Sequence, residues 1–535
     1  MHLPTAATRA RIKSTPPDAA DVVIVGAGLG GLMTAVRLAQ AGKKVSVFDA
    51  HYVAGGCATM FARGTAEARY TFDIGVHYVG DCGPGGKLPR LLDEVGVHVD
   101  WCPLDPDGFD ELVFPDFRFR IPASLELYRD RLVAQFPSEV PGIDRYIRMC
   151  REVARLGRPG APRGLGLAWD ALTSARLAAW HKDSTLGAFL DSCTQDVRLR
   201  AVIAGQNGDY GLPPSQVSLM LHCGLANHYF AGAWYPKGGG QVIADGLAAR
   251  LEELGGTLHL RHAVEGIEVS GGRATGVRWL GPHGTPGATH APVVVSNADL
   301  KRTVLELLPA EAAPPGMREA ATGWQMGGAI FLTCLAVRAD LRALGMGATN
   351  YWQFDDYDFE RLYAEAEGGG LPPVRGCYVT SATLKDPDTA GHAPAGVHTV
   401  EVMALMPGKP EVWGVPDREA RGPGYRHIEM YQSSKARVEA DLVGRLERLF
   451  PGATADVVHR ESATPVSHTR FTWASAGSGY GLAATPAQFL ARRPGARSTL
   501  QGLFLAGSST RSGHGVVGAL TSGAVAARTI LGERR

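Results

Sequence analysis

The chain has 535 residues, of which 45% are hydrophobic and 20% are charged, and its formal net charge is +1. This length is too great for one small core and predicts two or three domains. The composition excludes a disordered or fibrous protein, and the charge provides no field to recruit nucleic acid or anionic lipid. No apolar run in the sequence reaches the roughly 18 residues of a membrane span. We expect a cytoplasmic protein, with peripheral membrane contact left open.

Residues 1–20 carry basic side chains and prolines but no apolar segment of the kind found in signal peptides. We expect them to form a flexible tail. The eight cysteines are scattered without a C-x-x-C pair. This pattern argues against a zinc site and suits a reducing cytoplasm, so no metal is expected.

Residues 21–49 read DVVIVGAGLGGLMTAVRLAQAGKKVSVFD and predict a strand, a helix and a second strand. The apolar run 22–25 is typical of a strand buried on both faces. Good helix formers fill 32–40, and 45–48 predicts the next strand. This order is the setting in which a glycine-rich turn binds a dinucleotide.

The turn after the first strand satisfies G-x-G-x-x-G with Gly26, Gly28 and Gly31, and Gly30 lies within it. The first glycine permits the tight turn, the second lets the backbone approach a pyrophosphate, and the last lets the helix pack closely. Asp49 ends the second strand, where a carboxylate can accept hydrogen bonds from an adenosine ribose. We therefore predict a bound adenine dinucleotide. The alternative, a glycine-rich turn in a plain α/β core, would not need Asp49.

A second glycine-rich turn, with Gly55 and Gly56, follows the Asp49 strand and precedes the sequence FDIGVHYVG. Such a turn would bring further backbone N–H groups towards the phosphates. Its alternative is a plain loop.

Beyond this point, helical patterns between Pro and Gly breaks predict an inserted, mostly helical cap over 88–234. Residues 235–300 return to an α/β pattern, with a helix expected over 241–254 and a buried strand near 293–298. Residues 301–495 mix strands and helices, which is the material of a second sheet domain.

The C-terminus indicates which dinucleotide is bound. Residues 502–510 read GLFLAGSST and predict a buried strand that ends in a turn, and 512–518 open a small-residue helix that runs to about Leu531. The N-terminus of a helix presents free N–H groups and the positive end of the dipole. Pointed at a flavin, it would stabilise the negative charge of the reduced ring. A nicotinamide enzyme has no need of this closing element, so we expect non-covalent FAD.

From about Asp21 to Leu531 the chain resembles the FAD-dependent family of phytoene desaturases, carotenoid isomerases and retinol saturases. The resemblance is carried by GAGLGG with Asp49, the GG pair, FDIGVHYVG, YPKGGG, VVVSNAD, ATPVSHTRF with GYGL, and GLFLAGSSTRSGHGVVGALTSG. Of these, FDIGVHYVG is closer to the saturase and isomerase branch than to the bacterial desaturases. The resemblance implies the α/β fold class, with a discontinuous Rossmann-like FAD-binding domain, an inserted mixed-sheet substrate domain and a helical cap.

The same resemblance implies the domain limits. The FAD-binding domain would comprise 21–87, 235–300 and 496–535. The substrate domain, with its cap, would comprise 88–234 and 301–495.

The resemblance also implies further contacts with FAD. Val264 would contact the adenine through its backbone, and Gly507 with the turn formed by Gly515, Val516 and Val517 would lie against the flavin.

Two residues depart from the family pattern. Ser508 stands where an acid usually holds the ribityl chain, and serine makes fewer and weaker hydrogen bonds. Cys57 stands where the related amine oxidases have Arg; a covalent bond to the flavin is conceivable, but a buried structural cysteine is the commoner outcome.

A flavin exchanges a hydride with one carbon while the neighbouring carbon exchanges a proton, so a proton donor near the ring is useful. His77 and Tyr78 are the leading candidates, followed by His514, Arg470 and Tyr480. The alternative for each is a polar group that braces the cofactor. A long polyene also delocalises positive charge, so placement of the flavin in a dry tunnel would then suffice.

The predicted function is an FAD oxidoreductase that desaturates, saturates or isomerises an apolar polyene of the carotenoid or retinoid kind. One alternative is a natural-product tailoring enzyme that closes rings in a polyketide-type polyene, such as a polyene tetramate macrolactam. Another is a flavin-binding partner protein without turnover. The sequence has no second dinucleotide fingerprint, so we expect no NAD(P)H domain and NAD(P)H at most as a transient reductant.

Overall fold

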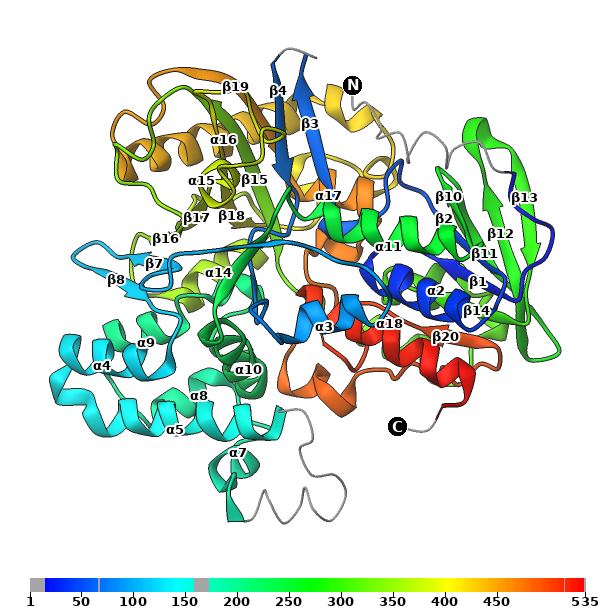
Figure 1. Cartoon of the computed structure of the whole chain (residues 1–535), viewed down its shortest axis with the longest axis horizontal. Helices are drawn as coiled ribbons and strands as arrows, with labels where there is room; N and C mark the ends of the chain where they lie inside the picture. Colours follow the sequence, from blue (N-terminus) through cyan, green and yellow to red (C-terminus); the bar gives the residue numbers. More distant parts are fainter. Residues whose placement is uncertain (1–14, 66–67, 158–172, 514, 534–535) are drawn as a thin grey trace.

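A parallel sheet on one side of the molecule joins the beginning, the middle and the end of the chain (Figure 1). In spatial order its strands are β10 (Thr257–Leu260), β2 (Val45–Asp49), β1 (Val22–Val25), β14 (Val293–Ser296) and β20 (Leu503–Leu505). All neighbouring pairs are parallel. The computed structural model describes residues 15–65, 68–157, 173–513 and 515–533.

The two faces of this parallel sheet are covered by different elements, because successive strand side chains point to opposite faces. Val22 and Ile24 pack against a helical layer, whereas Val23 and Val25 pack against a small antiparallel sheet. The helices are α2 (Leu29–Gln40), α11 (Gln241–Glu253) and α18 (Gly515–Leu531), and the small sheet is β11 (Ala263–Ser270), β12 (Arg273–Leu280) and β13 (Pro286–His290). Burial on both faces explains why the first strand is an uninterrupted apolar run.

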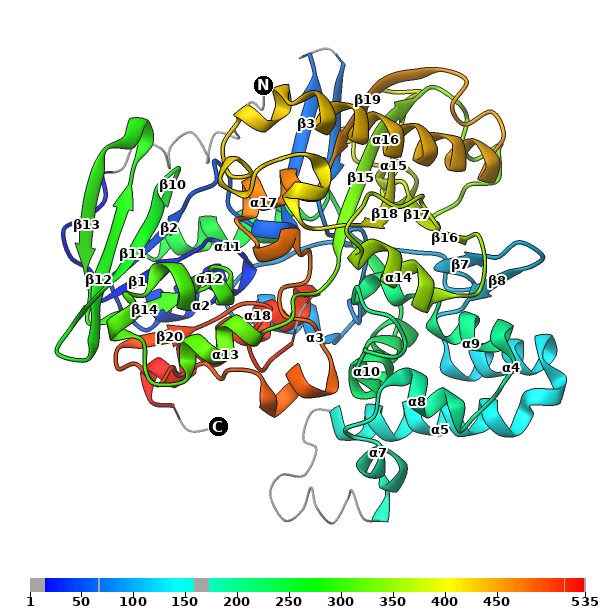
Figure 2. The same cartoon turned by 180° about the vertical axis from the view of Figure 1, so that it is seen from behind.

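A second, seven-stranded sheet lies on the other side of the molecule (Figures 1 and 2). In spatial order its strands are β19 (Val457–Ala463), β15 (Ala329–Val337), β18 (His398–Met406), β17 (Gly376–Thr380), β16 (Asn350–Phe354), β7 (Asp110–Val113) and β8 (Arg118–Ile121). Only the β16–β7 pair is parallel among these strands. On one face, residues such as Tyr351 and Val402 pack with the long helix α16 (Glu429–Leu449). On the other face, Trp352 and Phe354 pack with the cap.

The cap is a group of helices beside the free face of the seven-stranded sheet (Figure 2). They are α4 (Leu125–Gln135), α5 (Val140–Gly157), α7 (Arg176–Trp180), α8 (Leu186–Asp191), α9 (Val197–Ala204) and α10 (Leu219–Phe230). The expectation of a mostly helical segment misses β7 and β8, which extend the large sheet at its edge. Each of these strands has four residues, too few for an alternating pattern to stand out in the sequence.

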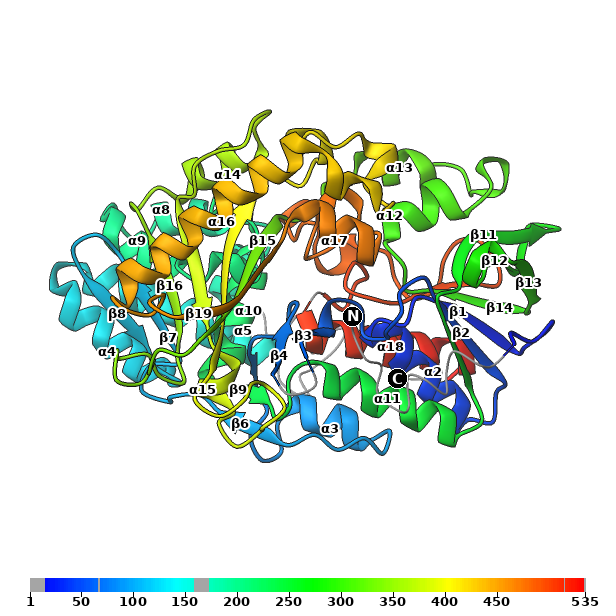
Figure 3. The ribbon, with the colours of Figure 1, turned by 90° about the horizontal axis from the view of Figure 1, so that it is seen from above.

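Short elements connect the two lobes. The hairpin of β3 (Met60–Gly64) and β4 (Arg69–Asp73) and the helix α17 (Pro465–Thr472) lie between the two large sheets (Figure 3). Others are β5 (Val79–Gly80), β6 (Trp101–Pro103), β9 (Ala233–Pro236), α3 (Lys87–Asp93), α12 (Leu300–Arg302), α13 (Met317–Gly323), α14 (Phe359–Glu367) and α15 (Ala382–Lys385). The described helices include none that is long and apolar enough to cross a membrane.

Candidate active site

A cavity of about 1600 Å³ extends from the glycine-rich turn after β1 to the cap. Its wall takes residues from the parallel sheet, the seven-stranded sheet and the cap helices α5 and α10. Sites for single small molecules usually measure roughly 300–1,000 Å³. The cavity therefore has room for a dinucleotide and for a second molecule beside it.

The dinucleotide end of the cavity is formed by backbone without side chains. Gly28 is the N-cap of α2 and makes no side-chain cap, so the first N–H groups of this helix are available to an anion. A Cβ added at Gly28 would lie 2.9 Å from Asn297 Nδ2, and one added at Gly30 would lie 2.6 Å from Asn297 Oδ1. At Gly31 an added Cβ would lie 2.1 Å from the carbonyl oxygen of Gly26. The turn thus tolerates only glycine, because Asn297 and β1 press against it.

Asp49 lies on the cavity wall at the end of β2. Its Oδ2 accepts a hydrogen bond from the Ala27 N–H at 2.6 Å, and its Oδ1 accepts one from the His51 N–H at 2.7 Å. Burial raises the pKa of Asp49, while these backbone donors lower it. Each carboxylate oxygen keeps a lone pair, which a ribose hydroxyl would use.

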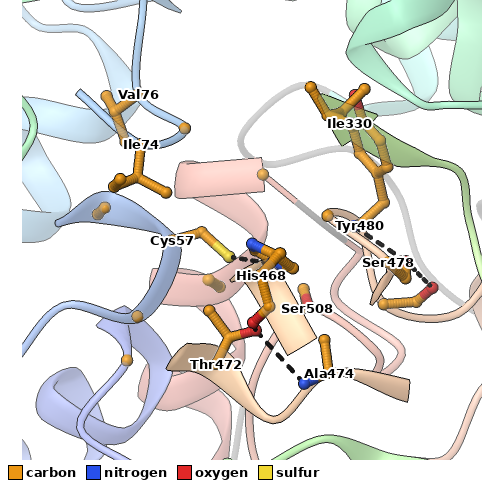
Figure 4. A pocket seen from close by; sticks show the side chains of 18 of the residues that line it. Cys57, Ile74, Val76, Ile330, His468, Thr472, Ala474, Ser478, Tyr480 and Ser508 are labelled. Atoms are coloured by element: carbon orange, nitrogen blue, oxygen red, sulfur yellow. Dashed lines mark hydrogen bonds between the residues drawn. The ribbon is translucent and has the colours of Figure 1, made fainter. Parts of the chain in front are cut away.

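The part of the cavity that the sequence predicts for the flavin is formed by the turn after β20 and by the start of α18. Gly507, Ser508, Gly515, Val516 and Val517 line the cavity there. The N-terminus of this 17-residue helix therefore faces the same cavity as that of α2. Figure 4 shows Ser508, Cys57 and His468 among the side chains that line this cavity.

These positions fit FAD. Two glycine turns and two helix N-termini supply N–H groups for phosphates and for the flavin edge, and Asp49 supplies an acceptor for ribose. Gly26, Gly55, Gly56 and Val264 also line the cavity, as the sequence predicts for FAD-binding residues. Gly31 does not line the cavity; it packs against the Gly26 carbonyl oxygen and the Asn297 side chain.

Cys57 faces the cavity and is not packed into the core, which corrects the expectation of a buried structural cysteine. Its Sγ lies 3.9 Å from His468 Nε2. Burial within the surrounding protein raises the pKa of the Cys57 thiol to about 11. The thiol is therefore protonated at neutral pH, a poor state for forming a covalent bond to a flavin.

The predicted catalytic candidates occupy different places. His77, Tyr78 and Tyr480 line the cavity on its cap side. Arg470 does not line the cavity. Its guanidinium packs on the ring of Phe471. The Phe471 ring also contacts the rings of His51 and Tyr52, which follow Asp49 closely in the chain. His514 lies outside the described residues.

His77 is held as a neutral side chain. Burial, together with the charge of Lys385, lowers the pKa of His77 to about 3. Its Nε2 is buried and has no hydrogen-bond partner in the described part of the chain. A neutral imidazole cannot supply a proton as an imidazolium would at neutral pH. The backbone carbonyl oxygen of His77 accepts a hydrogen bond from Lys385 Nζ, and this bond fixes the backbone beside Tyr78.

Tyr78 lies between two carboxylates that the sequence does not bring together. Its hydroxyl is 2.6 Å from Asp209 Oδ2 and 3.1 Å from Asp110 Oδ2. Asp209 lines the cavity, whereas Asp110 is buried behind it at the start of β7. The Tyr78 ring stacks on Tyr229 with the ring centroids 4.4 Å apart.

A buried cation supports this region from behind. Lys385 donates hydrogen bonds to the His77 carbonyl and, at 2.7 Å, to Thr380 Oγ1. Burial lowers the pKa of Lys385 and raises that of Glu401, and their mutual attraction opposes both shifts. Asp73, the acid of the FDIG sequence, accepts from Tyr235 at 2.5 Å and belongs to the same group.

The far end of the cavity is apolar. Leu221 and Leu225 come from α10, while Ile330, Leu332, Trp352, Phe354, Met403 and Leu405 come from the seven-stranded sheet. Apolar and aromatic walls with few polar groups favour an apolar ligand.

Two family models match parts of the chain. That of an NAD(P)-binding Rossmann-like domain matches residues 24–95, and that of a flavin-containing amine oxidoreductase matches residues 420–531. The first segment carries Gly28 and Asp49, and the second carries the start of α18, so both contribute to the cavity.

Relatives match nearly the whole chain. An all-trans-retinol 13,14-reductase of Danio rerio is 28% identical over 544 residues, covering 96% of this chain and 87% of its own length. A chloroplastic prolycopene isomerase of Arabidopsis thaliana is 23% identical and covers 96% of this chain and 83% of its own. The solved structure of an oxidoreductase from Methanosarcina mazei superposes with a TM-score of 0.61 at 20% identity, over 96% of this chain and 99% of that one. The structural likeness concerns the fold alone, and it confirms the predicted α/β class.

Proposed function

The chain belongs to the FAD-dependent family of phytoene desaturases, carotenoid isomerases and retinol saturases, and we propose that it acts on the carbon–carbon bonds of an apolar polyene. It is a flavin enzyme, and its cofactor is FAD. The relatives favour a retinoid- or carotenoid-like substrate over the polyketide-type polyene of a tailoring enzyme.

One observation carries the proposal: the cavity continues from the FAD-binding turns into an apolar chamber. A rod-like polyene needs an apolar wall that continues from the cofactor site, and part of this cavity has such a wall. Leu225 and Met403 are among the residues that would contact its chain. A charged or sugar-like substrate would leave polar groups unpaired against this wall.

Bound FAD supplies transfer of a hydride to or from a carbon atom. The residues of the chain have three tasks beside it. Asp49 and the glycine turns hold the cofactor, the aromatic wall excludes water, and Tyr78 with Asp209 offers an exchangeable proton at the chamber. We assign Arg470 a bracing role at the adenosine side and leave His77 and Tyr480 as wall residues.

The domain division belongs to the same proposal. Segments 21–87, 235–300 and 496–535 would form the FAD-binding domain, and 88–234 with 301–495 would form the substrate domain. The five-stranded sheet, which draws strands only from the first three segments, supports this division.

The test is anaerobic mixing of the FAD-loaded protein with retinoid and carotenoid polyenes. Oxidised flavin should lose its absorbance with a substrate that is desaturated, and reduced flavin should regain it with one that is saturated. Mass spectrometry of the product then reports loss of two hydrogens, gain of two, or unchanged mass for an isomer. If flavin and product stay unchanged with every apolar polyene, the proposal is wrong.

A further inference from the structure

The contacts of Tyr78 with Asp209 and Asp110 require one proton more than the phenol itself supplies. A phenolic hydroxyl donates one hydrogen bond, yet this oxygen lies within hydrogen-bonding distance of a carboxylate oxygen on each side. Two ionised carboxylates would therefore leave one contact without a proton. Both contacts become full hydrogen bonds when one of the two acids is protonated.

The hydrogen-bond directions behind Asp110 show which acid that is. Lys385 can only donate, so Thr380 Oγ1 accepts from it and donates in turn to Asn350 Oδ1 at 2.8 Å. The amide nitrogen of Asn350 then donates to Asp110 Oδ1 at 2.9 Å.

The other oxygen of Asp110 is held in the same way. Asp110 Oδ2 accepts from the amide nitrogen of Gln206 at 2.7 Å as well as from Tyr78. Donors on both oxygens favour the ionised carboxylate. The extra proton therefore belongs to Asp209, which donates to Tyr78, while Tyr78 donates to Asp110.

We propose that Asp209 is the catalytic acid of the substrate chamber, with Tyr78 and Asp110 as its positioning residues. This inference rests on the proposed function, because the proton needs a polyene to receive it. Asp209 is the member of the trio that combines a carboxyl group with a place on the cavity wall.

The surroundings of Asp209 agree with a protonated acid. Burial, followed by the charge of Asp110, raises the pKa of Asp209 well above its ordinary value. The pKa of Asp110 is raised by burial to about 6, against the effect of its donors. The titratable groups that face Asp209 are Asp110 and the tyrosines 78, 210, 229, 363, 378 and 480. Lys385 acts one layer further back, on Asp110.

In saturation, the proton of Asp209 would move to a carbon atom of the substrate. The O–H bond of Asp209 breaks, and a C–H bond forms from the π electron pair of one substrate double bond. Bound reduced FAD would supply the hydride that neutralises the positive charge on the neighbouring carbon. The Tyr78 hydroxyl can then turn from Asp110 to the new Asp209 carboxylate. Desaturation runs the same steps in reverse.

The first test is infrared spectroscopy of the FAD-loaded protein at neutral pH, without substrate. The difference spectrum between parent and Asp209→Asn should contain the C=O stretch of one protonated carboxylic acid, which moves in D₂O. Asparagine has the shape of the neutral acid, so thermal unfolding should be little changed. The matched control is Asp191→Asn, an acid of the same cap segment that pairs with Arg200, and its difference spectrum should lack the band of a protonated carboxylic acid. The absence of the acid band in the Asp209→Asn difference overturns the proposal.

The second test uses turnover in D₂O. The parent should place one solvent deuterium in each saturated product, and Asp209→Asn should lower turnover by at least about 100-fold, the usual range for a general acid. FAD affinity should stay within about threefold of the parent, since the variant leaves the glycine turns intact.

A further variant, Tyr78→Phe, keeps the stacked ring but removes the hydroxyl. It should change the pH at which turnover falls, a readout that a structural role would not move. Turnover of Asp209→Asn within about threefold of the parent overturns the acid role while leaving the proposed function intact. If the parent itself turns over no polyene, the proposed function fails first, whatever the infrared result.

Discussion

The two ends of the cavity bind by different means. At the proposed dinucleotide end the wall contains glycine backbone, two helix N-termini and the carboxylate of Asp49. At the substrate end the wall is apolar side chain, supported by a buried group of acids around Lys385. A backbone site is sensitive to added volume, whereas a buried ionic site is sensitive to removed charge.

The largest effect is expected from removing the buried cation. Lys385→Met would leave Asp73, Glu401 and Asp110 without it, and breaking a buried ionic group costs about 3–5 kcal/mol. The free energy of unfolding near neutral pH should fall by that amount. Denaturant titration measures it.

The pH dependence of that loss distinguishes charge from packing. In the variant the folded-state pKa values of the acids lie above their unfolded values, so the penalty is present above the unfolded pKa. The loss should therefore shrink as the pH falls through about 4, because Asp and Glu then become protonated in the unfolded state as well. Lys43→Met, at an exposed position, is the control and should stay within about 0.5 kcal/mol of the parent. A loss that does not depend on pH would mean that Lys385 acts only by packing.

The next largest effect is expected from adding a methyl group to the glycine-rich turn after β1. In Gly31→Ala the new Cβ would lie 2.1 Å from the Gly26 carbonyl oxygen, so the turn has to move. Overpacking of this kind costs about 1–3 kcal/mol, which corresponds to roughly 5- to 150-fold weaker FAD binding if the shift falls on the site. Titration of the apo-protein with FAD measures this. Gly444→Ala, in α16, meets only an ordinary contact at 3.5 Å and should bind FAD like the parent.

A smaller effect is expected from restoring the acid of the family pattern. Ser508→Asp should tighten FAD by up to about tenfold, since a charge-assisted hydrogen bond contributes about 1.5–3 kcal/mol against about 0.5–1.5 for serine. The buried Arg493, which donates to the Ser508 carbonyl at 2.8 Å, lies where it would also attract the new charge. The added negative charge should lower the flavin potential. Weaker FAD binding by Ser508→Asp than by the parent and Ser508→Ala would show that this turn has been rebuilt around serine.

The smallest expected effect is a shift in the alkaline limb of the pH–rate profile. The charge of Asp110 raises the pKa of Asp209, so Asp110→Asn should lower it. Turnover that needs the protonated acid is lost as the pH rises through that pKa, and the alkaline limb should therefore move to lower pH. The maximal rate should fall less than in Asp209→Asn. If the alkaline limb of the pH–rate profile does not move in Asp110→Asn, the charge of Asp110 does not raise the pKa of Asp209.

Much of the fold could be read from the sequence. Strand β1 has the limits predicted from the apolar run 22–25, because a strand buried on both faces carries an uninterrupted apolar pattern. The helix expected over 241–254 is also close to the observed one, which starts at Gln241 and ends at Glu253. The strands β7 and β8 were missed, since a four-residue edge strand has little pattern of its own.

The sequence by itself indicated the dinucleotide end, because its signal is local: G-x-G-x-x-G and Asp49 lie within one β–α–β unit. Only the tertiary structure decided the acid site. Tyr78 meets Asp110 across 32 positions of the chain and Asp209 across 131, while Lys385 reaches the His77 carbonyl across 308. None of these acids stands in a distinctive local pattern, and their protonation follows from burial and from each other's charge. Burial and mutual charge arise only when the cap, β7 and β17 close around Tyr78.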